Sequence, residues 1–272
     1  MYIVWILLSL LLLTAVLFVL STRCRKGHPG LESLRGWSYA HRGLHGNGIP
    51  ENSMAAFQAA LDGGYGIELD IHLLKDGNLA VFHDDTLDRT TGKPGRLEDL
   101  TAEDLANYPL EGTEELIPLF SQVLELFDGK APLIVELKPV GGNHAALTKA
   151  VCDLLDGYKG TYCLESFDPR CIHWLKKHRP DLIRGQLTEN FVANKQSPLP
   201  MILKLILTLQ LENFLVRPDF VAHRFADRKT LSMFLVRKLW GAQGVTWTLK
   251  TQEEHDAAVS EGYLPIFEGY RP

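Results

Sequence analysis

The strongest constraint on the fold is an alternation of strand-like and helix-like segments that begins near Trp37 and continues to the C-terminus. Short apolar runs of strand length occupy residues 37–41, 65–73, 132–138, 161–167, 182–187, 219–222, 242–247 and 264–267. Helical patterns occupy residues 52–63, 119–127, 145–155, 169–179, 197–216, 228–239 and 252–261. Eight strands that alternate with helices predict an α/β fold, the (β/α)8 TIM barrel, in preference to an open doubly wound sheet.

The N-terminus carries a second strong signal. Residues 2–20 contain no charge, and a helix of that length rises roughly 28 Å, enough to cross a hydrocarbon core. No Lys or Arg precedes the run, which argues against a cleaved signal peptide. The basic residues Arg23, Arg25 and Lys26 follow it, and the positive-inside rule then places the rest of the chain in the cytoplasm.

These patterns predict a domain order. We expect a single transmembrane anchor over residues 1–22, a juxtamembrane linker over 23–36 and a barrel domain over 37–272. The protein is then a single-pass protein of the cell membrane, with the lipid bilayer as a partner through its N-terminal helix. A net charge of −5 argues against a nucleic-acid partner, and the four cysteines lack metal-binding spacing.

Acidic residues converge in the stretch 65–92. Strand alternation places Glu68 and Asp70 on one face, and the Asp76-Gly77 pair predicts a hairpin whose two-residue turn sets Asp70 opposite His83. Carboxylates that close together repel unless a cation lies between them, so the pattern favours a divalent metal ion with oxygen ligands. The alternative is the solvated polar face of an edge hairpin.

Other predicted strands also end in polar residues. The first ends in His41-Arg42-Gly43, the third in Glu136-Leu137-Lys138 and the seventh in Trp247-Thr248. Active sites of such barrels lie at the carboxyl ends of the strands, so these side chains are expected to share one site. Trp247 is expected to line its mouth.

Several segments closely resemble the glycerophosphodiester phosphodiesterases. They are HRG at 41–43, PENS at 50–53, GIELD at 66–70, FHDDTLDRTTG at 82–92 and VELK at 135–138. The resemblance runs from about Trp37 to the end of the chain, and its fold is a TIM barrel. It implies a membrane-anchored, bacterial-type member that hydrolyses glycerophosphodiesters to sn-glycerol 3-phosphate and an alcohol.

The resemblance also implies roles for individual residues. Glu68, Asp70 and Glu136 match the ligands of one divalent cation, either Mg²⁺ or Ca²⁺. His41 and His83 match the paired acid and base.

Arg42 matches a phosphate-binding arginine and Lys138 a substrate-binding lysine, so with Trp247 they form the expected substrate-binding set.

Two other functions fit the same residues. One is a phospholipase- or sphingomyelinase D-like phosphodiesterase that acts on intact lipid, and the other is a non-catalytic, membrane-anchored lipid-binding barrel. The chain departs from the family pattern after its last strand, where it has Glu268-Gly269-Tyr270. It also has an unusually apolar segment at 197–216, expected either to face the core or to rest on a membrane surface.

Overall fold

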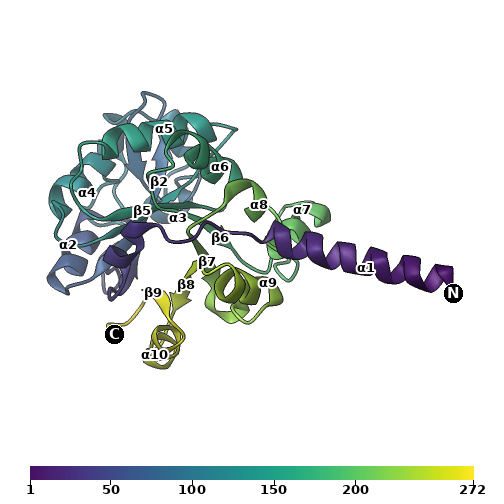
Figure 1. Ribbon diagram of the computed structural model, residues 1–272. Helices are drawn as coiled ribbons and strands as arrows, with labels where there is room; N and C mark the ends of the chain where they lie inside the picture. Colours follow the sequence, from purple (N-terminus) through teal and green to yellow (C-terminus); the bar gives the residue numbers. More distant parts are fainter.

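Eight parallel strands close into a barrel in the structure, a computed structural model that describes residues 1–272. The barrel strands are β1 (Tyr39–His41), β2 (Gly66–Leu73), β4 (Leu133–Leu137), β5 (Tyr162–Ser166), β6 (Arg184–Thr188), β7 (Phe220–Arg224), β8 (Gln243–Leu249) and β9 (Tyr263–Phe267). Strand β1 pairs with both β2 and β9, which closes the sheet. The predicted TIM barrel is confirmed, and each predicted strand overlaps one barrel strand (Figure 1).

Helices connect the strands and cover the outside of the barrel (Figure 1). They are α2 (Met54–Asp62), α3 (Asp88–Thr91), α4 (Phe120–Phe127), α5 (His144–Leu155), α6 (Pro169–His178), α7 (Met201–Thr208), α8 (Asn213–Val216), α9 (Leu231–Phe234) and α10 (Gln252–Ser260). Helix α4 shows why they pack there: its buried residues Phe120, Val123, Leu124 and Phe127 follow the spacing that places apolar side chains on one helical face.

The barrel interior is apolar at its amino end and polar at its carboxyl end. Tyr39, Ile134, Phe220, Val245 and other inward-facing strand residues form a buried apolar cluster. This cluster supports the site from below, because a packed interior holds the strand ends in one arrangement.

Residues 23–36 do not form a free tether. The 3-10 turn η1 (Pro29–Leu34) inserts Leu31 and Leu34 into the apolar cluster inside the barrel. The Tyr39 hydroxyl donates to the Leu34 carbonyl at 2.7 Å, and Arg25 pairs with Asp219. The expected linker is therefore part of the barrel's packing, and it joins α1 to the barrel closely.

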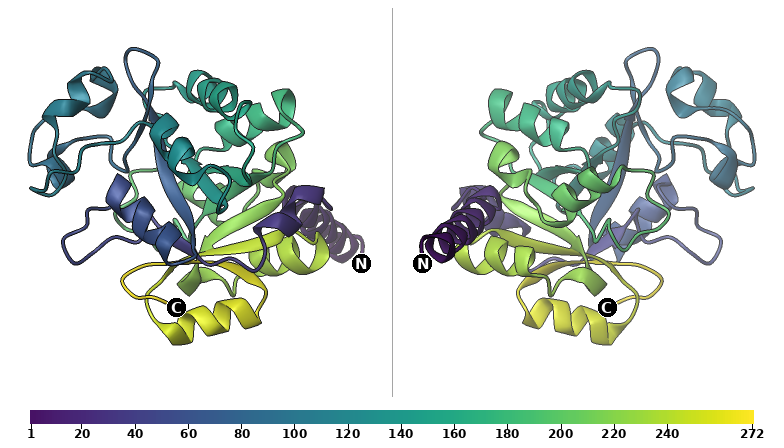
Figure 2. Two further views of the ribbon diagram at one scale, coloured as in Figure 1. Left: turned by 90° about the vertical axis from the view of Figure 1, so that its left-hand side faces the viewer. Right: turned by 90° about the vertical axis from the view of Figure 1, so that its right-hand side faces the viewer.

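Helix α1 (Tyr2–Ser21) extends away from the barrel, and none of its residues is buried (Figure 1). It is the one helix long and apolar enough to cross a membrane, with a mean hydropathy of 3.0 over 18 residues. Both views of Figure 2 place its base beside helices of the C-terminal half of the chain, where the Trp240 indole donates to the Val19 carbonyl at 3.2 Å.

The predicted register of the hairpin is wrong by one residue. Strand β3 (Leu79–Val81) pairs Leu73 with Leu79, and the Phe82 amide donates to the Asp70 carbonyl at 3.0 Å. Phe82, not His83, therefore lies opposite Asp70. The cause is the turn: it closes with three residues instead of two, and Gly77 takes the left-handed conformation at φ +88°.

The segment predicted as one helix over 197–216 is divided. Helix α7 ends at Thr208, Gln210 adopts a left-handed φ of 58°, and α8 then begins at Asn213. The core-facing alternative is also wrong for α7, since Met201 is 59% and Ile202 64% exposed.

Candidate active site

Three carboxylates meet at the carboxyl end of the barrel. Glu68 and Asp70 extend from β2 and Glu136 from β4, and the parallel register sets Asp70 beside Glu136. All three are buried, and their oxygens lie within 4.8 Å of one another. Two neighbouring strands thus bring together the residues that the sequence predicted as metal ligands.

The electrostatics of this cluster favour a cation. Burial, together with the charge of Asp70, raises the pKa of Glu68 well above its usual range. Burial raises the pKa of Glu136 to about 7 although Lys138 opposes it. Burial also disfavours ionised Asp70, but the charges of Lys138, His83 and Arg42 outweigh that effect and lower its pKa. A divalent ion would restore full ionisation of all three carboxylates.

Glu165 is a fourth buried carboxylate, which the sequence reasoning missed. It lies on β5 beside Glu136 and is 1% exposed. One oxygen of Glu165 and one of Asp70 are buried without a hydrogen-bond partner. These orphaned oxygens, in a set made of carboxylates alone, fit a hard divalent cation. The sequence did carry a signal for Glu165, since it is the one charged residue in the strand Tyr162–Ser166.

Two cations reduce the repulsion without cancelling it. The Lys138 ammonium lies 3.1 Å from Glu136 and 3.5 Å from Asp70. The Arg42 guanidinium lies 3.6 Å from Asp70 and binds Glu51 at 2.9 Å. Lys138 does not line the cavity described below, so in this structure it contacts carboxylates and not the open site.

Asn52 is a second residue that the sequence reasoning missed. Its amide donates to Asp70 at 2.9 Å, and its backbone N–H donates to the Arg42 carbonyl at 2.9 Å. Both Asn52 and Arg42 have left-handed backbones, with φ of 51° and 53°. Such conformations are rare outside glycine and concentrate at functional sites.

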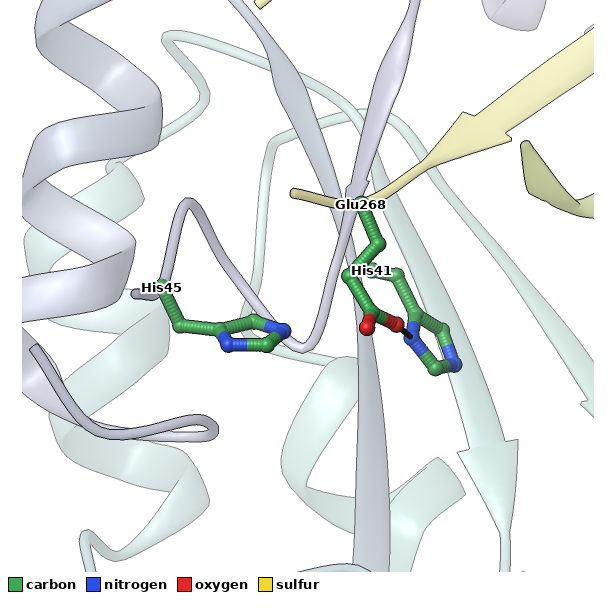
Figure 3. Close-up of side chains that lie close together, drawn as sticks. All are labelled: His41, His45 and Glu268. Carbon is green, nitrogen blue, oxygen red and sulfur yellow. Dashed lines mark hydrogen bonds and ion pairs between the residues drawn. The ribbon is translucent and has the colours of Figure 1, made fainter. Parts of the chain in front are cut away.

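Each predicted histidine is held by a carboxylate. The Nδ1 atom of His83 lies 2.5 Å from Asp84, and Nδ1 of His41 lies 2.5 Å from Glu268 (Figure 3). A carboxylate at Nδ1 fixes the proton there and leaves Nε2 free to accept one. Burial lowers the pKa of both imidazoles, and the Glu268 and Asp84 carboxylates partly raise it again.

A second group with the spacing of metal ligands is explained without a metal ion. His41, His45 and Glu268 also bring ligand atoms within 4.8 Å, and Figure 3 shows their side chains converging. The other Glu268 oxygen binds the Lys250 ammonium at 2.5 Å, so that carboxylate already has a cation. We therefore place the candidate metal site at Glu68, Asp70 and Glu136.

A cavity of about 70 Å³ opens onto these groups. Its lining residues are His41, Arg42, Glu68, His83, Glu136, Glu165, Phe167, Leu187, Trp247 and Ile266. Trp247 is half-buried and meets Phe167 edge to face at 5.7 Å between ring centroids, while its indole N–H has no partner. The volume suits a phosphate group but not a whole diester, whose alcohol must extend outward.

The fold and site together define a barrel phosphodiesterase. Residues 41–267 match the Glycerophosphoryl diester phosphodiesterase family, and the chain belongs to that family.

Two bacterial glycerophosphodiester phosphodiesterases are similar to it. The protein from Bacillus altitudinis is 43% identical over 107 residues, which cover 37% of this chain and 43% of that protein. The protein from Caldanaerobacter subterraneus subsp. tengcongensis is 36% identical over 160 residues, which cover 54% and 65%. The chain thus spans less than two thirds of the length of these two relatives.

A third relative and two solved structures match over more of the chain. Glycerophosphodiester phosphodiesterase 1 of Bos taurus is 30% identical over 245 residues, covering 79% of this chain and 72% of that protein. An Oleispira antarctica phosphodiesterase in complex with the product sn-glycerol-3-phosphate superposes with a TM-score of 0.70 at 22% identity, covering 86% and 93%. The Thermotoga maritima glycerophosphodiester phosphodiesterase gives 0.65 at 22%, covering 85% and 93%. These two solved structures have the same barrel fold as this protein.

Proposed function

We propose that this protein hydrolyses glycerophosphodiesters to sn-glycerol 3-phosphate and an alcohol at the carboxyl end of its barrel. The observation that carries the proposal is the meeting of three buried carboxylates and two carboxylate-held histidines around one cavity. Family membership supports it, as does the product bound by the Oleispira antarctica phosphodiesterase.

Glu68, Asp70 and Glu136 are the residues that would hold one divalent cation, Mg²⁺ or Ca²⁺. When bound, the ion supplies positive charge to the phosphate oxygens where negative charge develops in the transition state. Lys138 and Asn52 keep Asp70 in place through the contacts described above.

The two histidines move the protons. One histidine starts neutral, and its Nε2 takes the proton of the attacking hydroxyl; the other starts protonated, and its Nε2–H gives a proton to the leaving alcohol oxygen. In this proposal the attacker is the neighbouring glycerol hydroxyl, which forms a cyclic phosphate. Water then opens the cyclic phosphate while His41 and His83 exchange roles, which returns both to their starting protonation.

Arg42 and Trp247 are the proposed contacts to the substrate. Both line the cavity, and a guanidinium binds two phosphate oxygens with parallel N–H groups. The indole N–H of Trp247 is buried without a hydrogen-bond partner, and the side chain lines the same cavity.

We also propose that α1 anchors the protein in a membrane with the barrel in the cytoplasm. The length and hydropathy of α1 support this, and so do the basic residues that follow it. A variant that lacks residues 2–17 keeps the contacts of Val19 and Arg25 and should become soluble. Residual membrane binding by this variant would instead favour insertion of the exposed apolar side chains of α7.

A substrate panel tests the catalytic proposal. Full-length protein in detergent is assayed for glycerol 3-phosphate release from glycerophosphocholine, glycerophosphoethanolamine and glycerophosphoglycerol, with Mg²⁺, Ca²⁺ or EDTA. Release with a metal ion and none with EDTA is expected. Cleavage of micellar phospholipid without cleavage of soluble diesters would favour the lipid-directed phosphodiesterase, and no cleavage under any condition would favour the non-catalytic lipid-binding barrel.

A further inference from the structure

A second polar cavity lies where α1 joins the barrel. Its volume is about 600 Å³, and it is separate from the catalytic cavity, with which it shares no residue. Its lining residues are Arg23, Cys24, Arg25, Lys26, Lys176, Arg184, Arg217 and Trp240. Six of these eight residues are cationic and none is acidic, so the cavity concentrates positive charge in a protein whose net charge is −5.

The positive charge is almost uncompensated. Among the six cations only Arg25 forms an ion pair, with Asp219. Arg184 is 2% exposed, and its Nη1 is buried without any hydrogen-bond partner. A buried guanidinium donor without an acceptor is costly, and an acceptor from a ligand would remove that cost.

The like charges also perturb one another. Burial, and then the charge of Arg25, lowers the pKa of Arg184 to about 10. Burial and Arg23 lower the pKa of Arg217, and burial and Arg217 lower that of Lys176. Binding of an anion would reverse these shifts, because a negative charge stabilises the protonated forms.

The cavity lies at the C-terminal end of α1. Arg23, Arg25 and Lys26 lie within five residues of the last residue of the helix, Ser21, and the Trp240 indole donates to Thr22 at 3.1 Å. The Arg23 guanidinium lies 5.7 Å from the centre of the Trp240 ring. With α1 across a bilayer, this level is that of the lipid headgroups, where Trp and basic residues are enriched.

We propose that this cavity is a binding site for a phosphate group, of the kind that an anionic phospholipid headgroup presents. Guanidinium groups match phosphate geometry, and the cavity is lined by residues that follow the C-terminal end of α1, the end that meets the barrel in Figure 1. The proposal does not depend on the hydrolytic function, because none of its residues lines the catalytic cavity.

Thermal melting of the full-length protein in dodecyl maltoside micelles tests the site. The titrants are dioctanoyl phosphatidic acid, dioctanoyl phosphatidylcholine and inorganic phosphate. Phosphatidic acid is expected to raise Tm by several degrees, and phosphatidylcholine is not. An equal rise with inorganic phosphate would assign the site to phosphate alone, and a rise with the lipid only would assign it to membrane lipid.

The double variant Lys176→Gln/Arg217→Gln tests whether the rise in Tm comes from binding in this cavity. Without a titrant, the relief of like-charge repulsion opposes the loss of the bonds from Lys176 and Arg217 to the carbonyls of Leu215 and Phe214, so the Tm of the variant alone is the baseline for its titration. The concentration of phosphatidic acid that gives half of the Tm shift should rise at least tenfold. Lys177→Gln, on the same helix but outside this cavity, should respond as the wild type does.

Three results would overturn the proposal. They are no Tm shift with either phosphate titrant, an equal shift with phosphatidylcholine, and a shift that survives in the double variant. The last would place the binding elsewhere, including the catalytic site. Because melting is read without turnover, a protein that binds here yet hydrolyses nothing would refute only the proposed function.

Discussion

Replacing Glu268 by Gln tests how the structure tunes one catalytic histidine. The Glu268 carboxylate accepts from Nδ1 of His41 at 2.5 Å and binds the Lys250 ammonium through its other oxygen. Gln keeps the shape but removes the charge. We expect kcat/KM to fall while the fold is retained.

The magnitude follows from the hydrogen bond. A bond to a charged partner contributes about 1 to 1.5 kcal/mol more than a neutral one, which corresponds to roughly a five- to thirteen-fold change in rate. A loss of about fivefold is therefore the expected minimum. The loss would be larger if the amide turned its NH₂ toward Nδ1, since the proton of His41 would then move to Nε2 and the base would be lost.

The pH profile supplies an independent readout. Burial lowers the pKa of His41, and Glu268 partly raises it again. Removing the carboxylate lowers the pKa further, so the limb of the profile that reports His41 should move to lower pH, whether this histidine acts as acid or base. Glu253→Gln, an exposed change on α10, is the control. A kcat/KM within twofold of wild type, together with an unmoved profile, would refute this account of Glu268.

Three further predictions concern other parts of the molecule. His83→Ala should lower kcat by about 10²–10⁴-fold without changing Tm, and unchanged turnover would remove this histidine from the mechanism. Glu136→Gln should weaken Mg²⁺ or Ca²⁺ binding, measured by calorimetry, at least tenfold; unaltered affinity would contradict its role as a ligand. Burial raises the pKa of Glu212 from 4.5 to about 8, so the contribution of this one residue to the free energy of unfolding is greatest below pH 4.5 and falls by on the order of a few kcal/mol as pH rises through 8. Denaturant melts at pH 5 and 8.5 should show a smaller change in the free energy of unfolding for Glu212→Gln than for the wild type. An equal change in both proteins would refute a buried, neutral Glu212.

Local sequence patterns determined the barrel and most of the proposed site. Strand alternation put Glu68 and Asp70 on one face, and the order of the strands put Glu136 beside them. Such inferences hold because a short apolar strand has only two faces, and because parallel strands end at the same side of the barrel.

Tertiary structure alone decided the contacts between distant segments. His41 and Glu268 are 227 positions apart, and no periodicity links them. The one-residue error in the hairpin arose because the turn closed with an extra residue, which only the paired strands reveal. The burial of Glu165 and the packing of Leu31 and Leu34 into the barrel likewise depend on how closed strands and a preceding turn share one interior. A sequence pattern assigns a side chain to a face of its own element, whereas the partner across that face is set by packing over the whole chain.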